Sequence, residues 1–399
     1  MDTQDGSGRA QRPYDIVLFG ATGFVGVLTA RYLARTAPEG CRWALAGRSR
    51  ARLERLRDEL AAEHPACAGL PLIEAGADDP EAMRGLAESA RVIATTVGPY
   101  LWYGEPLVAA CADAGTDYLD LTGEPEFVDL VYVRHDARAR ETGARLVHSC
   151  GFDSVPGDLG VYFTVGQLPE GVPLTVDGFI SSNGMFSGGT FASALTVMSR
   201  ARQSLRAARQ RRLHEPRVVG RRARSPLGGP RYSAETGAWA LPLPLLDGQI
   251  ITRSARALPR YGPDFRYRHY AAVRTLPMAV GGAAAVCAVA GLAQLPAARR
   301  WLLRRLEPGA GPDERRRAKS WFSVRFVGEG GGRTVYTEVS GGDPGYDETA
   351  KIFGESALCL AFDPLPAGSG QVTTAEAMGD ALLERLQRAG IRFRVASAR

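Results

Sequence analysis

Short apolar runs separated by helix-like intervals dominate the first 150 residues. Six such runs end in glycine, and they cover residues 14–20, 43–47, 71–76, 91–98, 117–123 and 145–151. The intervals place apolar residues at helical spacing, as at Val27, Leu28 and Tyr32. Short β-branched or aromatic runs that alternate with helices are typical of βαβ units. We therefore predict an α/β fold that begins with a doubly wound parallel sheet and right-handed crossovers.

Beyond residue 155 the pattern is less regular. Strand-like runs cover residues 174–182, 321–330 and 333–341. With 399 residues, 45% of them hydrophobic, the chain is long enough to fill more than one core. We therefore predict two domains that share the C-terminal segment. The polar residues 1–13 have no apolar stretch like that of a signal peptide, and we expect them to form a disordered leader.

The first apolar run leads directly into the sequence FGATGFVG, with Gly20, Gly23 and Gly26 at three-residue spacing. Gly20 allows a tight turn, Gly23 lets the backbone approach a pyrophosphate, and Gly26 lets the helix pack closely on the sheet. Strand, turn, helix and second strand follow in the order that a dinucleotide site requires. The predicted contacts are Gly20, Thr22, Gly23, Phe24, Val25 and Gly26. A purely structural glycine turn is the alternative.

The second run ends without the acidic residue that grips the ribose of NAD in such sites. Arg48 and Ser49 stand there instead. A guanidinium can bind a 2′-phosphate bidentately and stack on adenine, so these residues predict NADP(H) as the cofactor. An ordinary surface arginine is the alternative. Asp78, after the third run, is predicted to contact the adenine edge, although a helix N-cap at Asp78 or Asp79 would fit the same sequence.

The fourth run ends at the edge of the sheet where open α/β folds bind their ligands. Thr96, Gly98 and Pro99 are expected to line the nicotinamide end of the site. Tyr103 and Tyr100 are the candidate catalytic residues, because a phenol can donate a proton. The alternative is that these aromatic residues only pack the next helix.

The fifth and sixth runs bring further polar residues to the same edge. Glu124 and Asp153 are candidate substrate-binding residues, and Gly151 is a candidate cofactor contact. Turn formation and helix capping are the alternative roles of the carboxylates. Ser187 and Thr190 open a predicted helix whose N-terminus could hold an anionic substrate group, and a plain capped helix is the alternative.

Composition and charge exclude several classes of protein. The six cysteines are scattered without a C-x-x-C pair, so we predict neither a metal site nor a disulfide frame, and expect a cytoplasmic protein. The formal net charge is +6, and its densest run is the arginine-rich arm at residues 199–226. This run has no aromatic residues to stack bases, so we expect a solvated helical arm and no nucleic-acid partner. A role in binding an anionic substrate or a membrane surface is the alternative.

The apolar segment at residues 276–297 is followed by a basic amphipathic stretch that includes Arg300 and Trp301. Its length approaches the roughly 20 residues that span a bilayer, but alanine and glycine dominate it. Three interpretations stay open: a buried helix, contact with a membrane surface or a long acyl chain, and a true span.

Four motifs resemble the saccharopine dehydrogenase-like oxidoreductases, in particular an actinobacterial branch of trans-acting enoyl reductases. They are GATGFVG, LAGRSRARLERL, TTVGPYLWYGEPLVAACADAGTDYLDLTGE and HSCGFDSVPGDLG. The resemblance spans most of the chain. It implies an NADP-binding Rossmann domain at residues 14–155, an α+β domain for substrate binding or dimerisation at residues 156–345, and C-terminal helices at residues 346–399 that return to the first domain.

The same resemblance implies the chemistry that we expect of the chain. We predict an NADPH-dependent oxidoreductase that reduces an α,β-unsaturated acyl or polyketide thioester, free or on a carrier protein. A homodimer and a peripheral position at the inner face of the plasma membrane are further options. Two alternatives are kept: a saccharopine-type dehydrogenase that forms imines, and a non-catalytic NADP-binding scaffold at a membrane surface.

Overall fold

The computed structural model describes residues 11–184, 188–216, 218–243, 246–304 and 313–397. The first domain contains β1 (Tyr14–Phe19), α2 (Phe24–Thr36), β2 (Trp43–Gly47), α3 (Arg50–Glu63), η1 (Pro65–Gly69), β3 (Leu72–Glu74), α4 (Pro80–Ser89), β4 (Ala90–Thr95), α5 (Tyr100–Tyr103), α6 (Glu105–Ala114), β5 (Asp117–Asp120), α7 (Pro125–Thr142) and β6 (Arg145–Val147). The six strands coincide with the six apolar runs, which confirms the predicted parallel sheet.

A seventh strand, which the sequence did not predict, completes this sheet from the far end of the chain. β14 (Gly370–Val372) pairs in parallel with β6, and the strand order is β14-β6-β5-β4-β1-β2-β3. Its central residue is held by side chains: the Gln371 amide donates to Asp136 Oδ1 at 2.7 Å, and Arg253 Nη2 donates to the Gln371 carbonyl at 2.6 Å. A three-residue strand with a polar centre depends on such distant partners.

The second sheet has mostly antiparallel pairing. Its path is β15-β13-β12-β7-β11-β10-β9, with β8 paired to β11. The strands are β7 (Leu174–Ser182), β8 (Arg222–Arg224), β9 (Arg231–Ser233), β10 (Ala238–Pro242), β11 (Asp264–Val273), β12 (Phe322–Gly330), β13 (Arg333–Gly341) and β15 (Arg392–Ala396). β7, β12 and β13 match the three strand-like runs of the sequence.

Helix α8 (Val155–Val165) joins the two sheets. It begins after β6 and packs on β12 and β13. Close packing requires a glycine at residue 160, because a Cβ there would lie 2.4 Å from the Phe326 ring. The remaining helices are α9 (Gly188–Ser199), α10 (Ala201–His214), α11 (Asp247–Ala257), η2 (Pro259–Tyr261), α12 (Leu276–Ala293), α13 (Pro296–Arg304) and α14 (Glu314–Arg317).

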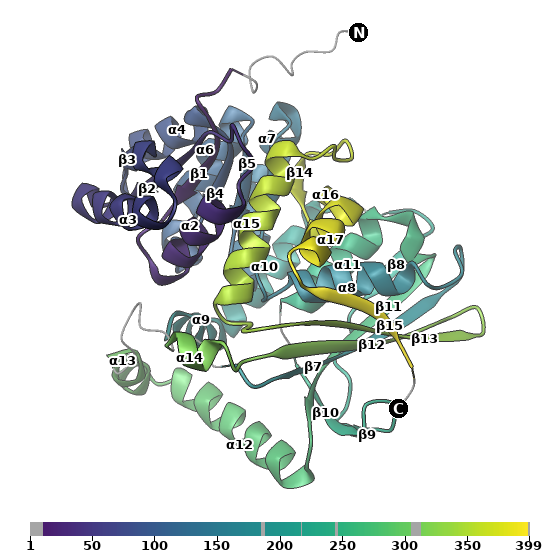
Figure 1. The fold of residues 1–399 in the computed structure, drawn as a ribbon. Helices are drawn as coiled ribbons and strands as arrows, with labels where there is room; N and C mark the ends of the chain where they lie inside the picture. Colours follow the sequence, from purple (N-terminus) through teal and green to yellow (C-terminus); the bar gives the residue numbers. More distant parts are fainter. Residues whose placement is uncertain (1–10, 185–187, 217, 244–245, 305–312, 398–399) are drawn as a thin grey trace.

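The predicted return of the C-terminal segment to the first domain is made by α15 (Asp347–Phe362), which packs on α2 (Figure 1). The Tyr32 hydroxyl donates to Glu355 Oε1 at 2.6 Å, and a Cβ at residue 354 would clash with the Tyr32 ring. α16 (Thr374–Ala377) and α17 (Gly379–Arg388) follow. The C-terminal segment also contributes one strand to each sheet, because β14 joins the first sheet and β15 joins the second.

The N-terminal leader and the arginine arm differ from their predicted descriptions. Within the expected leader, Arg12 donates to the Ala90 carbonyl at 2.5 Å, whereas residues 1–10 lie outside the described part of the chain. One face of α10 packs on α7. Arg211 lies 2.8 Å from Asp129, and Arg200 lies 2.7 Å from Glu126. The arm is therefore solvated only on its outward face, because its inward arginines meet acidic residues of the first domain.

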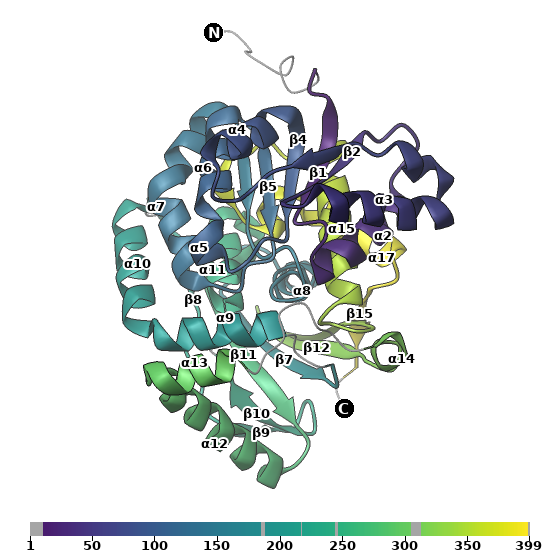
Figure 2. The same cartoon turned by 90° about the vertical axis from the view of Figure 1, so that its left-hand side faces the viewer.

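The interpretation of residues 276–297 as a buried helix is wrong. Only Ala279 and Ala293 of α12 are buried, and both views place the helix at the periphery of the second domain (Figures 1 and 2). In the described part of the chain, α12 alone is long and apolar enough to cross a membrane by length and composition. Composition could not reveal this exposure, since alanine and glycine are among the residues most often buried in protein cores.

Candidate active site

The glycine turn between β1 and α2 has the shape that the spacing of its glycines predicts. Gly20 has a φ of +84°, in the left-handed region that favours glycine. A Cβ at Gly26 would lie 2.2 Å from the Gly20 carbonyl oxygen, so α2 can approach the turn only without a side chain there. Gly23 occupies the N-cap position, and no side chain caps the helix. The α2 N-terminus thus offers backbone amides and a positive dipole end to a phosphate.

The carboxyl end of β2 lies beside this turn. Arg52 Nη2 donates to the Thr22 carbonyl at 2.8 Å and ties α3 to the glycine turn. Arg48 is exposed, and Ser49 is the N-cap residue of α3 without a side-chain capping bond. A cationic side chain free to move and a hydroxyl with spare bonding capacity fit a 2′-phosphate, which NAD lacks.

At the end of β3, the two neighbouring aspartates have different positions. Asp79 caps α4, with its carboxylate accepting from the amides of Glu81 and Ala82. Asp78 is exposed next to it. The capping alternative therefore applies to Asp79, and the adenine contact of Asp78 stays a prediction.

The loop after β4 is fixed to the glycine turn. Thr96 Oγ1 donates to the Gly20 carbonyl at 3.0 Å. Gly98 and Pro99 follow, and α5 then begins at Tyr100. The predicted nicotinamide residues of this loop therefore adjoin the predicted phosphate residues, at one edge of the sheet.

Tyr100 and Glu124 bond to the backbone of this loop. The Tyr100 hydroxyl donates to the Thr95 carbonyl and accepts from the Leu121 amide, both at 3.1 Å. Glu124 accepts from the amides of Tyr100 at 3.2 Å and Leu101 at 2.8 Å. Both side chains are buried. In this structure they hold α5 in place, and the catalytic role of Tyr100 and the substrate role of Glu124 stay predictions.

Tyr103, the other candidate catalytic residue, is 48% exposed at the end of α5. Its neighbour Trp102 lies under the guanidinium of Arg200, 5.4 Å from the ring centroid. This contact brings the start of α10 to the aromatic loop. Tyr103 therefore stands at the outer rim of the sheet edge, and its catalytic role remains a prediction.

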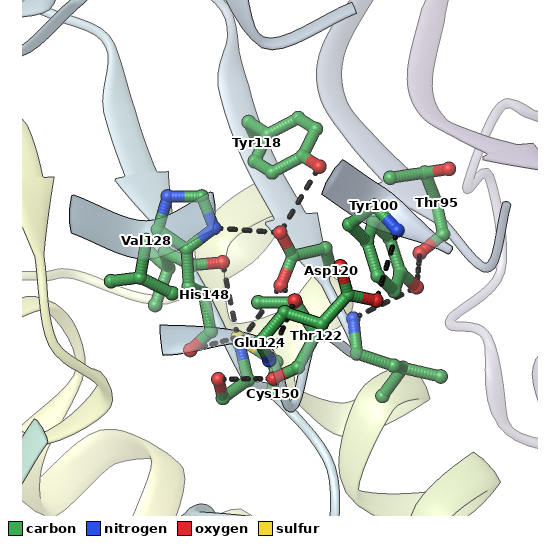
Figure 3. A network of polar contacts seen from close by, with 12 residues as sticks. Thr95, Tyr100, Tyr118, Asp120, Thr122, Glu124, Val128, His148 and Cys150 are labelled. Carbon is green, nitrogen blue, oxygen red and sulfur yellow. Dashed lines mark hydrogen bonds and ion pairs between the residues drawn. The ribbon is translucent and has the colours of Figure 1, made fainter. Parts of the chain in front are cut away.

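A buried carboxylate organises the ends of β5 and β6 (Figure 3). Asp120 is fully buried and lies 2.6 Å from His148 Nδ1 and 3.1 Å from the Tyr118 hydroxyl. It also accepts from the amides of Thr122 at 3.1 Å and Ser149 at 2.9 Å. Ser149 has a φ of +60°, which is unusual for a residue with a side chain. Asp120 therefore fixes the path of the loop that leads to Gly151.

The loop after β6 enters the junction between the domains. A Cβ at Gly151 would lie 2.7 Å from Leu121 and 3.1 Å from Thr349 of α15. The Phe152 amide donates to Thr349 Oγ1 at 3.3 Å. Asp153 follows with an exposed side chain. Close contact on both sides allows only glycine at residue 151, and its role as a cofactor contact stays a prediction.

The predicted anion site at the start of α9 is not described completely. Ser187 lies outside the described residues, and of Thr190 only the helical backbone is described. Its role as a substrate contact stays a prediction. In the described part of the chain, no group of three or more His, Cys, Asp or Glu residues is placed to hold a metal ion.

Three residues that the sequence did not predict form a buried polar group in the second domain. Asp247 begins α11, and Tyr267 and His269 lie on β11. The Tyr267 hydroxyl is 2.9 Å from His269 Nδ1, which is 3.4 Å from Asp247 Oδ2. The alternating pattern of Phe265, Tyr267 and His269 could have revealed a buried strand face, but not the partner of that face.

Taken together, the parallel sheet, the uncapped α2 N-terminus and the glycine turn define a dinucleotide-dependent oxidoreductase with an added α+β domain. The residues present fit NADP(H): backbone amides for the pyrophosphate and Arg48 with Ser49 for the 2′-phosphate.

Comparisons with known proteins identify the family within this class of oxidoreductases. Residues 16–147 match the family described as Saccharopine dehydrogenase NADP binding domain. A Mycobacterium tuberculosis protein with the provisional name trans-acting enoyl reductase is 40% identical, covering 95% of this chain and 97% of that protein. A Mycobacterium ulcerans trans-acting enoyl reductase is 37% identical, covering 96% and 97%.

The chain therefore belongs to the saccharopine dehydrogenase-like family, in the branch of these mycobacterial relatives, and it is an NADP(H)-dependent oxidoreductase. Among solved structures, a saccharopine dehydrogenase from Saccharomyces cerevisiae has a TM-score of 0.54. It covers 96% of this chain and all of that one, at 12% sequence identity. This likeness supports the two-domain fold and says nothing about the substrate.

Proposed function

We propose that this protein is a trans-acting enoyl reductase that uses NADPH to reduce the α,β-double bond of an acyl or polyketide thioester. The observation that carries the proposal is the similarity to named enoyl reductases along nearly the whole chain, including the second domain. The NADP-binding domain alone would fit many dehydrogenases. A carrier protein and coenzyme A are both suitable bearers of the thioester.

The residues of this chain would bind and orient the reactants. Bound NADPH supplies the hydride that such a reduction needs. The glycine turn would hold its pyrophosphate, and Thr96, Gly98 and Gly151 would border the nicotinamide ring. The second domain would cover the thioester and exclude water, which strengthens every electrostatic contact at the reacting carbons.

The test is turnover of purified full-length protein with NADPH and a panel of 2-enoyl thioesters of increasing chain length, followed through the absorbance of the reduced nicotinamide. Gly23→Asp is the matched control. Its carboxylate would repel the pyrophosphate, whereas aspartate is a good helix N-cap, so the fold is retained. We expect turnover by the wild type and none by the variant.

The saccharopine-type alternative predicts different substrates. An imine-forming dehydrogenase would oxidise NADPH with a 2-oxo acid and an amine, and would leave enoyl thioesters unchanged. Running both panels with one preparation separates the two chemistries. Turnover only with the 2-oxo acid and amine would overturn the enoyl reductase proposal.

We also propose that the protein contacts an anionic membrane surface through α12 and α13. Met278, Val280 and Val286 of α12 are each more than half exposed. Trp301 is 54% exposed, and Arg300 beside it is exposed. Apolar residues followed by tryptophan and arginine are the composition of an interfacial helix, and the net charge of +6 favours anionic lipids.

Flotation with vesicles of anionic or purely zwitterionic lipids tests this contact. We expect binding to anionic vesicles at low salt, and loss of binding when Met278, Val280 and Val286 are all replaced by glutamate. Leu213→Glu on α10 is the control, because Leu213 is 86% exposed on another surface. Failure to float, or a dimer in size-exclusion chromatography that the triple substitution dissolves, would overturn membrane contact. Binding without turnover of either substrate panel would favour the scaffold alternative.

A further inference from the structure

The outward face of α10 presents a row of arginines to solvent. At about 100° per residue, six exposed positions of this helix fall within about one third of its circumference. They are Arg202, Leu205, Arg206, Arg209, Arg212 and Leu213. The two leucines are 58% and 86% exposed, and residues 199–214 contain no acidic side chain. The four arginines are called the α10 arginine row below.

The α10 arginine row has no acidic partner in the described part of the chain. The ion pairs of this helix and its N-cap are made by Arg200 and Arg211, which face inward. The exposed arginines of the neighbouring α7 differ, since Arg134 pairs with Glu105 and Arg138 pairs with Asp113. Like charges three and four residues apart on a helix repel one another. An external acidic surface would relieve this repulsion.

The inward face of α10 fixes the row in place beside the first domain. Arg200 Nε and Nη2 donate to the Glu126 carboxylate of α7 at 2.8 and 2.7 Å. Arg211 Nε lies 2.8 Å from Asp129, one helical turn further along α7. At the end of α10, Glu215 accepts from Arg256 of α11 at 2.7 Å. The row is therefore a rigid surface on the outside of the molecule (Figure 2).

The N-terminal end of this surface adjoins the candidate active site. The Arg200 guanidinium lies over the ring of Trp102, 5.4 Å from its centroid. Trp102 belongs to α5, which follows the loop of Thr96 and Gly98 at the carboxyl edge of the parallel sheet. A molecule seated on the α10 arginine row is thus next to the edge where the nicotinamide is expected.

The shape and chemistry of the row fit an acidic protein surface. From Arg202 to Arg212 the helix rises about 15 Å, and the arginines lie in a line along its convex side. Arginines that bind a single phosphate group converge on it instead. Leu205 and Leu213 favour a partner that places apolar side chains among its acids, as protein interfaces do. A nucleic-acid strand would instead require aromatic residues for its bases, and residues 199–226 contain none.

We propose that the α10 arginine row, with Leu205 and Leu213, docks an acidic carrier domain that bears the enoyl group as a thioester. The proposal rests on the proposed enoyl reductase function, and it selects a carrier protein over coenzyme A as the bearer. A carrier docked there presents its flexible prosthetic group beside Trp102, towards the nicotinamide edge. Complementary charge accelerates the encounter and leaves the chemical step unchanged.

The experiment reverses two charges at the centre of the row, in the double variant Arg206→Glu with Arg209→Glu. Glutamate forms helices about as well as arginine, so α10 is retained, and circular dichroism checks this. The matched control is Arg333→Glu with Arg388→Glu, which changes the net charge equally at exposed positions of β13 and α17. Each protein is assayed with one 2-enoyl chain on three bearers: a purified acidic acyl carrier protein, coenzyme A, and uncharged N-acetylcysteamine.

We expect the row variant to lose only the carrier-bound substrate. Its kcat/KM for the carrier thioester should fall about 10- to 100-fold at low salt, with little change in kcat at saturation. Turnover of the coenzyme A and N-acetylcysteamine thioesters should equal that of wild type, as should NADPH affinity. Raising the salt from about 0.02 to 0.3 M should lower the wild-type kcat/KM for the carrier thioester and affect the row variant less.

A second readout does not depend on turnover. Fluorescence anisotropy of the labelled carrier protein should show binding to wild type and to the control variant, and at least tenfold weaker binding to the row variant. Equal losses in both variants would reduce the effect to net charge and overturn the inference. An equal loss with the coenzyme A thioester would overturn it too, because the row would then bind a small anionic group.

The remaining outcomes separate the inference from the proposed function. Turnover of all three thioesters with no difference between the row variant and wild type would overturn the inference alone. The same holds if the row variant keeps carrier turnover and loses binding to a DNA duplex or to anionic vesicles, since the row would then serve that partner. No turnover of any thioester by wild type would overturn the proposed function, and this inference with it.

Discussion

Replacing Asp120 by alanine should destabilise the protein strongly, because the carboxylate serves four donors at once. These donors are the Tyr118 hydroxyl, His148 Nδ1 and the amides of Thr122 and Ser149. All four residues are buried, and alanine supplies no acceptor. Each buried donor left without a partner costs about 1–3 kcal/mol, so the lower bound of the sum is about 4 kcal/mol.

The matched control is Asp120→Asn, which keeps the size of the side chain. Its carbonyl oxygen can still accept from the two amides, whereas its NH2 group faces the groups that previously donated. We expect a loss of about 1–2 kcal/mol, with part of it recovered when His148 changes tautomer. Tyr118→Phe, which removes one donor, should also cost less than Asp120→Ala.

The assay is urea unfolding followed by circular dichroism and tryptophan fluorescence, with the free energy extrapolated to water. The two probes must coincide, because a chain with two domains can unfold in more than one step. A loss below about 1 kcal/mol for Asp120→Ala, or equal losses for the alanine and asparagine variants, would refute the view that Asp120 fixes the loop ends.

Three further predictions concern the cofactor site and the junction with the arginine arm. Gly23→Asp should abolish NADPH binding in a fluorescence titration and leave the melting temperature unchanged or higher; retained binding would show that the α2 N-terminus does not hold the pyrophosphate. Arg48→Ala should weaken NADPH binding by about 1.5–3 kcal/mol and leave NADH binding unchanged; an equal effect on both cofactors would contradict a 2′-phosphate contact. Burial raises the pKa of Asp129 to about 6, so this group contributes stability that is present below about pH 4 and lost as the pH rises through 6. Urea midpoints measured from pH 4 to 7 should therefore fall less in Asp129→Asn than in wild type, and parallel pH curves would refute the assignment.

Local sequence patterns identified the first domain because its strands and glycine turn are specified by neighbouring residues. Gly26 follows the end of strand β1 at Phe19 by only seven residues, so the sequence itself shows that a glycine lies where the helix must pack on the sheet. β14 escaped prediction, since three residues with Gln371 at the centre form a strand only beside β6 and Arg253. The exposure of α12 could not be predicted either, because the sequence of an apolar helix does not show which other elements pack against it.

In the candidate site too, local sequence predicted the contacts made within one segment and missed those made between distant segments. The backbone geometry of the glycine turn follows from the spacing of its glycines. The hydrogen-bond partners of Tyr100 and Glu124, in contrast, depend on which backbone groups of the folded loop lack other partners. Both side chains have the chemistry of catalytic groups, yet here they hold α5. Conversely, Asp247 and His269 had no motif to reveal them.

One buried carboxylate explains why the two domains can share a site. Asp158 of α8 accepts from the Ser254 hydroxyl of α11 at 2.5 Å. It also accepts from the Thr374 hydroxyl at 2.7 Å and the Ala375 amide at 2.9 Å. A fully buried acceptor that joins α8, α11 and the C-terminal segment resists relative movement, because separating them would leave polar groups unpaired. This junction therefore holds the second domain in a fixed position relative to the carboxyl edge of the first domain's sheet, where α8 begins.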